Sequence, residues 1–158
     1  MSNEIVTEII ALILQDLPEG LVATLFVLSL AKIRYDAKTI ISIGFLTALT
    51  NLFVRLFLPI AFGMHTVIFI FAFALYIRLF TKVQLSRIFL SVLIYIACIV
   101  AAESIYSMPL LKWTGLTYEE CRANPFLRAA FALPGEIFIL LLALVINLYH
   151  KKRGNYSA

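Results

Sequence analysis

The stretch "TIISIGFLTALTNLFVRLFLPIAFGMHTVIFIFAFALYIRLF", residues 39–80, decides the fold of this chain. Its only Lys, Arg, Asp or Glu residues are Arg55 and Arg78, and most of the others are apolar. A helix that crosses a bilayer needs about 20 mostly apolar residues. The stretch is long enough for two such helices joined by a tight turn at Pro59–Met64. We therefore predict membrane spans at residues 39–58 and 59–80.

The composition of the whole chain extends this prediction. Of its 158 residues, 63% are hydrophobic and 14% are charged, and the mean hydropathy is +1.00. Soluble domains are about half apolar and a quarter charged. The sequence therefore indicates an all-α integral membrane protein with about five transmembrane helices. The other three spans are expected near residues 17–33, 87–107 and 129–149. Residues 1–150 would form one transmembrane domain, followed by a basic tail at 151–158.

The segment before the first span has two interpretations. Residues 3–15, "NEIVTEIIALILQ", are too short to cross a bilayer alone and carry Glu4 and Glu8. They favour an interfacial or re-entrant helix that meets the first span at Pro18. The alternative is one continuous, proline-kinked span that starts at residue 4. No Lys or Arg precedes Lys32, so the segment does not read as a cleaved signal peptide.

Local signals predict where other helices begin. Leu-Pro pairs are expected to open the first, third and fifth spans, because proline is tolerated in a first helical turn. These pairs are Leu17-Pro18, Leu58-Pro59 and Leu133-Pro134. In the connection before the last span, Thr117 stands three residues before Glu120, which is the spacing of a capping box. It predicts a short helix that starts at Tyr118 and stops before Pro125.

The basic residues predict an orientation. Nine of the thirteen lie in three short segments between or after spans. They are Lys32, Arg34 and Lys38, then Arg78, Lys82 and Arg87, and finally Lys151, Lys152 and Arg153. Because such residues remain on the cytoplasmic side, we expect the N-terminus outside and the C-terminus inside. The basic pI of about 9.2 is then explained by membrane topology, and no nucleic-acid partner is expected.

Polar residues in the outer third of the spans predict a site. An ionisable group inside a membrane is costly and often functional. In the second span, Thr47, Asn51 and Arg55 recur every four residues and so share a helix face, and Glu4, Glu8 and Asp16 do so before the first span. We predict an outward-facing polar vestibule that binds a ligand. Its residues would be Arg55, Glu103, Glu136, Asp16, Glu19, His65, Asn51 and Arg128.

Each member of this set also has a local explanation. Arg55 and Glu103 have the composition of a structural ion pair between helices. Carboxylates such as Glu19 and Glu136 interact favourably with a helix N-terminus. His65 would serve as a hydrogen-bonding group at the membrane surface. These alternatives stay open at the level of sequence.

Catalytic and metal motifs are missing from the sequence. It has no HExxH pair, no glycine-rich phosphate loop and no GxSxG turn, and Cys98 and Cys121 have no metal-site spacing. We therefore expect no enzyme, no cofactor, no metal site and no disulfide framework.

The order of several anchors resembles the multi-pass membrane module of Gram-positive sensor histidine kinases of the quorum or sporulation type. The anchors are Arg55, Leu58-Pro59, "FGMH" at 62–65, Glu103, the Thr114–Pro125 loop and Leu133-Pro134. The resemblance implies a bacterial plasma membrane protein that senses a small molecule or peptide at its outer face. The chain departs from the family by ending at "HKKRGNYSA" without a kinase domain. A protein partner or a homo-oligomer would then carry the signal.

Two further functions are compatible with the same features. A substrate-binding or small transport subunit would use the same vestibule as part of a larger complex. A structural or chaperone-like membrane protein would need no ligand at all.

Overall fold

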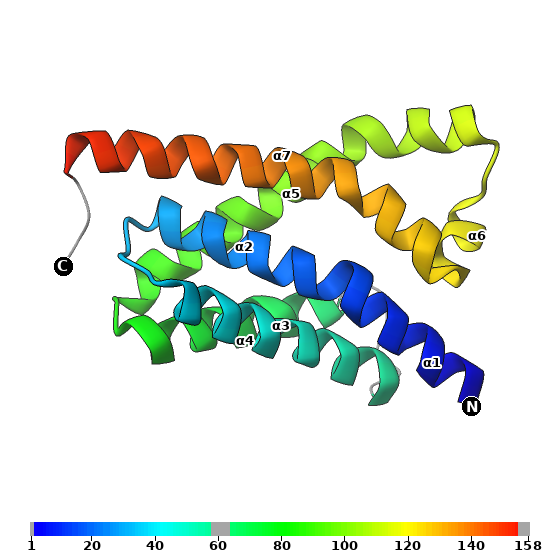
Figure 1. Ribbon diagram of the computed structural model, residues 1–158, viewed down its shortest axis with the longest axis horizontal. Helices are drawn as coiled ribbons and strands as arrows, with labels where there is room; N and C mark the ends of the chain where they lie inside the picture. Colours follow the sequence, from blue (N-terminus) through cyan, green and yellow to red (C-terminus); the bar gives the residue numbers. More distant parts are fainter. Residues whose placement is uncertain (1, 58–63, 155–158) are drawn as a thin grey trace.

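The computed structural model describes residues 2–57 and 64–154, and all of their regular structure is helical. This confirms the predicted all-α membrane fold. The helices follow one another as an up-and-down bundle (Figure 1). In chain order they are α1 (Ser2–Ala11), the π-helical segment η1 (Leu12–Asp16), α2 (Leu17–Leu30), α3 (Ala37–Phe57), α4 (Met64–Thr81), α5 (Leu85–Thr114), α6 (Tyr118–Ala123) and α7 (Pro125–Arg153).

Four segments of the described chain are long and apolar enough to cross a membrane, so this is a multi-pass membrane protein. They are Ile5–Leu30, Ala37–Phe57, Leu85–Thr114 and Pro125–Arg153. The predicted third span corresponds to α4, which is apolar but shorter over its described residues. The Leu58-Pro59 pair and all of the predicted turn except Met64 lie outside the described residues.

The first span is one continuous helix from residue 2 to residue 30, which matches the alternative interpretation. The expectation of a separate interfacial helix meeting a span at Pro18 is therefore wrong. Pro18 has no N–H to donate to the carbonyl four residues earlier. The π-helical segment η1 ends two residues before Pro18, and the Leu17 N–H bonds to the Leu12 carbonyl five residues back. A wider turn of this kind accommodates the proline without ending the helix.

The last two spans are longer than predicted. The helix α5 continues through Pro109 to Thr114, and α7 begins at Pro125, so Pro134 lies inside α7. The expectation that Leu133-Pro134 opens a span is therefore wrong. The start is instead set by Asn124, whose side chain accepts hydrogen bonds from the backbone N–H groups of Phe126 (2.9 Å) and Leu127 (3.4 Å). Proline at the first helical position follows this cap.

The short helix α6 confirms the predicted capping box. The Glu120 backbone N–H donates to the Thr117 hydroxyl (3.3 Å), and the Thr117 backbone N–H donates to the Glu120 carboxylate (2.8 Å). The Thr117 hydroxyl also donates to this carboxylate (2.8 Å), and the two bonds from the Thr117 backbone and side chain lower the pKa of the exposed Glu120 carboxyl. The reciprocal bonds satisfy two backbone donors that a helix start leaves unpaired.

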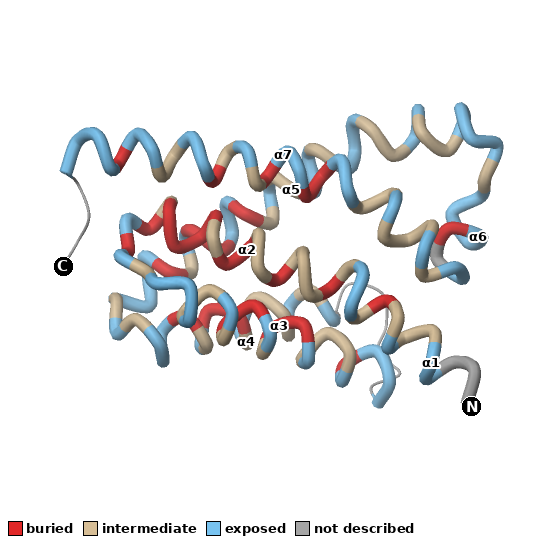
Figure 2. Tube along the Cα trace, viewed as in Figure 1, coloured by how far each residue is buried: buried red, intermediate tan, exposed pale blue. Residues whose placement is uncertain are grey.

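Within the bundle, α2 is the central helix and packs against α3, α5 and α7. Figure 2 shows many buried residues along α2, while exposed residues are frequent along the other helices. An aromatic cluster closes the centre, where the ring of Tyr95 lies 6.0 Å from that of Phe26 and 6.4 Å from that of Phe73. Exposed Leu, Ile, Val and Phe side chains on the outer faces suit contact with lipid.

The backbones of α2 and α3 approach closely at two glycines. A Cβ atom added to Gly20 would lie 2.6 Å from the Gly44 carbonyl oxygen, and one added to Gly44 would lie 3.0 Å from the Leu21 nitrogen. Real Cβ atoms do not approach a backbone oxygen this closely. Glycine at both positions therefore sets the distance between α2 and α3, as small residues do in other membrane helix pairs.

The two ends of the bundle differ in charge. The connections α2–α3 and α4–α5 and the end of α7 lie together, at the left of Figure 1, and carry the three basic segments. We call this the basic end, and the opposite end, with the N-terminus and α6, the α6 end. At the basic end Asp36 precedes α3, and its carboxylate accepts a hydrogen bond from the Thr39 N–H (2.9 Å). Hydrogen bonds from the Thr39 side chain and backbone lower the pKa of Asp36.

Candidate functional site

The charged side chains between the helices form two groups. The first, the ion-pair network, joins Glu8, Asp16, Arg55 and Arg128. The Arg55 side chain donates to the Asp16 carboxylate, and its Nε lies 3.1 Å from a Glu8 oxygen. Arg128 Nη2 lies 3.2 Å from the same Glu8 oxygen. The network therefore ties the first span to α3 and α7.

Burial makes this network more than a surface contact. Asp16 is 2% exposed, and the side chains of Arg128, Glu8 and Arg55 are 16%, 22% and 28% exposed. Ion pairs taken out of water depend on close, hydrogen-bonded geometry, because each charge loses its hydration. Here Asp16 is matched by Arg55, and Glu8 lies between two arginines. Both arginines are thus held by carboxylates of the first span.

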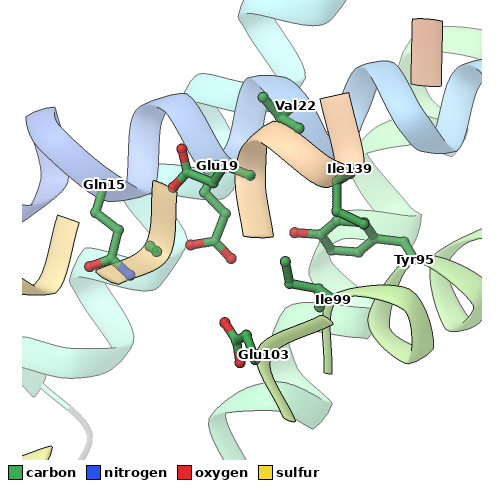
Figure 3. A pocket seen from close by; sticks show the side chains of 9 residues that line it. Gln15, Glu19, Val22, Tyr95, Ile99, Glu103 and Ile139 are labelled. Carbon is green, nitrogen blue, oxygen red and sulfur yellow. The ribbon is translucent and has the colours of Figure 1, made fainter. Parts of the chain in front are cut away.

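The second group, the acid cavity, lies between α2, α5 and α7 (Figure 3). Its volume is about 20 Å³, roughly the room of a single water molecule. Three of its lining residues are carboxylic acids, each from a different helix: Glu19 of α2, Glu103 of α5 and Glu136 of α7. The remaining lining residues are Gln15, Val22, Tyr95, Ile99, Ala132 and Ile139.

The three acids differ in exposure. Glu136 is 8% exposed, Glu19 is half-buried, and Glu103 is exposed. In Figure 3 the carboxyl groups of Glu19 and Glu103 are directed to the same space, with the Tyr95 hydroxyl at its far side. The order of burial therefore places Glu136 at the inner wall and Glu103 at the mouth.

No cation of the described chain neutralises the acid cavity. Among the described side chains, no salt bridge joins Glu19, Glu103 or Glu136 to a basic group, and Glu19 is hydrogen-bonded to the Tyr95 side chain. Arg55 and Arg128 are engaged in the ion-pair network instead. The alternative that Arg55 and Glu103 form a structural ion pair is therefore not found, because Arg55 pairs with Asp16 and Glu8 instead. Three carboxyl groups face one small space with no basic partner from the described protein.

Glycines beside two of the acids bring the helices together. Gly20 follows Glu19 and packs on Gly44, as described above. Gly135 precedes Glu136, and a Cβ atom there would lie 2.8 Å from the Tyr106 hydroxyl and 3.0 Å from Ile99 Cδ1, both on α5. The related sequences "LPEG" and "LPGE" thus combine a carboxylate with a close helix approach.

The acids lie deeper than the outer third predicted for them. Glu103 is eleven residues from the end of α5 at Thr114, and Glu136 is eleven residues from the start of α7 at Pro125. At a rise of about 1.5 Å per residue, each lies roughly 16 Å from the α6 end of its helix. Both helices extend further in this direction than their apolar runs, which explains the difference.

The structure brings together six of the eight predicted site residues, in two adjoining groups. Asp16, Arg55 and Arg128 are in the ion-pair network, and Glu19, Glu103 and Glu136 line the acid cavity. Asn51 is half-buried on α3, and His65 is exposed near the start of α4; neither lines the cavity. The side chain of Glu4 lies outside the described side chains.

Sequence reasoning missed two polar residues of the cavity, Gln15 and Tyr95. Gln15 directly precedes Asp16, but the prediction of a break near Pro18 separated it from the first span. Tyr95 lies two turns before Glu103, on the same face of α5. This spacing could have placed Tyr95 beside Glu103, but Tyr95 is one of many aromatic residues in the chain and did not stand out.

The described side chains include no group of three His, Cys, Asp or Glu residues arranged to hold a metal ion. No protein-family model, curated protein or solved structure matches this chain.

Proposed function

We propose that this protein is a membrane-integral sensor, or receptor-like protein, which binds a small ligand in the acid cavity and signals through a partner protein. The observation that carries the proposal is the meeting of Glu19, Glu103 and Glu136 at one cavity without a basic partner among the described side chains. Each comes from a different helix, so a bound ligand would contact three spans at once.

The free-energy cost of unpaired carboxyl groups inside a membrane supports a binding role for these acids. Carboxyl groups inside a membrane-spanning bundle are unfavourable unless they are paired, neutralised or hydrated. The ion-pair network shows that this chain pairs its other buried acids, Glu8 and Asp16. Packing alone gives no reason to keep three more acids at the cavity. A ligand that neutralises them does give one.

The packing beyond the cavity favours signalling over passage. Towards the basic end, α2 and α7 contribute the fully buried residues Ala23, Val27, Ile139 and Ala143 to the apolar core. The cavity therefore ends on a packed floor. Because cores are close-packed, a ligand that draws α7 towards α2 would shift packing along α7 to its basic end. A partner at that end would detect the shift.

A transport subunit is the second candidate, and one observation favours it. Glu103 is exposed on a membrane-spanning helix, where a carboxyl group facing lipid would be costly. A second subunit that covered α5 would enclose this group and extend the cavity. In this alternative the protein would pass its ligand to that subunit.

The proposal includes an orientation in the bacterial plasma membrane. The N-terminus and α6 would face outwards and the basic end would face the cytoplasm, in agreement with the preference of Lys and Arg for the cytoplasmic side. The acid cavity, which lies nearer the α6 end on α5 and α7, would then receive its ligand from outside.

Native mass spectrometry of the full chain in lipid nanodiscs tests the binding role. We expect a small molecule retained by the wild-type protein and by Glu119→Gln, an exposed α6 control, and lost from Glu136→Gln and Glu19→Gln. Retention by all four proteins would contradict the proposed site. Ligand uptake by proteoliposomes that contain only this chain would contradict the sensor and support transport.

A further inference from the structure

The charge of the acid cavity constrains its ligand. Its polar lining consists of Glu19, Glu103, Glu136, Gln15 and the Tyr95 hydroxyl. None of these groups carries a positive charge, and both nearby arginines are held by Glu8 and Asp16. A ligand with a negative charge would be repelled by these acids in their ionised form. A cation would be attracted to them and would neutralise their charge.

A buried carboxyl group indicates that the cation donates hydrogen bonds. Glu136, 8% exposed, lines the cavity and has no hydrogen-bond partner among the described side chains. Buried acceptors without a donor are rare in folded proteins and costly. A donor placed in the cavity would satisfy this group. Gln15 also lines the cavity, and in Figure 3 its amide nitrogen lies nearer to Glu19 than its oxygen does.

The volume of the cavity and the placement of its three acids favour one kind of cation over others. Its volume of about 20 Å³ takes a group the size of one water molecule. A quaternary ammonium group is larger than this and has no N–H donor. The acids are not placed to coordinate a metal ion. A primary ammonium group is compact and carries three donors, and the cavity presents three carboxyl groups.

We propose that the acid cavity binds the primary ammonium group of a small amine, with the three N–H donors directed to Glu19, Glu103 and Glu136. The remainder of the amine leaves through the mouth at exposed Glu103. Charge-assisted hydrogen bonds to carboxylates are the strong ones in proteins. This inference rests on the proposed function, because it names the chemical class of ligand for the same site.

Binding of methylammonium chloride to the full chain in zwitterionic nanodiscs tests the proposal. Equilibrium dialysis with radiolabelled methylammonium measures binding directly, and the apparent melting temperature measures stabilisation by the bound cation. Tetramethylammonium and sodium chlorides at the same ionic strength are the control salts. We expect one methylammonium per chain, with no displacement by either control cation at equal concentration.

Matched variants locate the binding. Glu136→Gln keeps the shape of the side chain and removes its charge, and we expect it to weaken methylammonium binding about tenfold or more, the loss of one charge-assisted hydrogen bond. Glu103→Gln, at the exposed mouth, is a second variant with little risk to folding and the same expected direction. Glu119→Gln on α6 should bind as the wild type does.

The outcomes separate this inference from the proposed function. Equal binding of sodium or tetramethylammonium, or no methylammonium binding by the wild-type protein, would overturn the ammonium site. If native mass spectrometry then finds a retained ligand without an amine that Glu136→Gln loses, the sensor proposal stands and only its ligand class is wrong. If no ligand of any class is retained, both proposals fail.

Discussion

Arg55 on α3 is bound to Asp16 of the first span, and Glu103 on α5 is not its partner. This relationship divides the polar residues of the bundle into a neutralised network and an acidic cavity. Asp16 is almost completely buried and Arg55 partly so, so the pair fixes where α3 lies against the first span. The division also leaves Glu103 available to a ligand or to a neighbouring protein.

Double-mutant cycles will show whether Arg55 is coupled energetically to Asp16, as the structure has it, or to Glu103. Arg55→Ala should lower the free energy of unfolding by about 1–3 kcal/mol, below the roughly 3–5 kcal/mol of a fully buried pair, because this side chain is 28% exposed. The cycle with Asp16→Ala should show a coupling energy of about 0.5 kcal/mol or more. Thermal or steric-trap unfolding in a membrane mimic measures these values. Strong coupling to Glu103→Ala with none to Asp16→Ala would contradict the network.

Gly20→Ala should destabilise the bundle by forcing α2 and α3 apart. The added Cβ would meet the Gly44 carbonyl oxygen at 2.6 Å, and backbone cannot move aside as a side chain can. Overpacking of this kind costs about 1–3 kcal/mol. Ala101→Val adds bulk at an exposed position of α5 and is the control. Equal melting temperatures for the wild type and Gly20→Ala would show that the helices are not in close contact.

Protection of α6 from hydrogen exchange should depend on pH through Glu120. Its pKa is lower in the folded protein than its ordinary value of 4.5 because of the bonds from Thr117. The ionised carboxylate therefore stabilises the cap above pH 4.5, and this contribution disappears as pH falls through the lowered pKa. Thr117→Ala should remove the dependence. The first turn of α7 is the control, since its cap, the Asn124 amide, does not titrate.

Reporter fusions will test the orientation in the membrane. Because three basic segments gather at one end of the bundle, a fluorescent protein fused after residue 158 should fold in the cytoplasm and fluoresce. An alkaline phosphatase inserted at Glu119 in α6 should be active on the opposite side. The reverse pattern would place the acid cavity nearer the cytoplasmic face.

The sequence predicts some levels of this structure much better than others. Long apolar runs report span number and approximate limits, and the Thr117–Glu120 spacing reports α6, because both depend on neighbouring residues only. The rotation of each helix about its axis depends on packing. That is why the sequence left open whether Arg55 pairs with Glu103, which shares its predicted depth, while its actual partners are Asp16 and Glu8.

Prolines show the same limit. Pro18 and Pro134 were read as helix starts from their local preference, yet both lie within longer helices. At Pro18 the wider η1 turn lets the helix continue although proline has no N–H to donate. No single residue type predicts such a change in the backbone. The glycines that permit close helix approach carried a clearer signal. Gly20 with Thr24, and Gly44 with Ala48, have the four-residue spacing of small residues at membrane helix contacts.

The η1 turn affects how the first span would tolerate the loss of one residue. A π-helical turn accommodates one residue more than an α-helical turn, so loss of a single residue between Leu12 and Asp16 would restore regular winding. The flanking helices would keep nearly the same rotation relative to one another, because the wider turn already absorbs the extra residue. Regular winding would, however, bring the Pro18 ring against the carbonyl four residues earlier. A single-residue deletion in these five positions should therefore be tolerated better together with Pro18→Ala than alone.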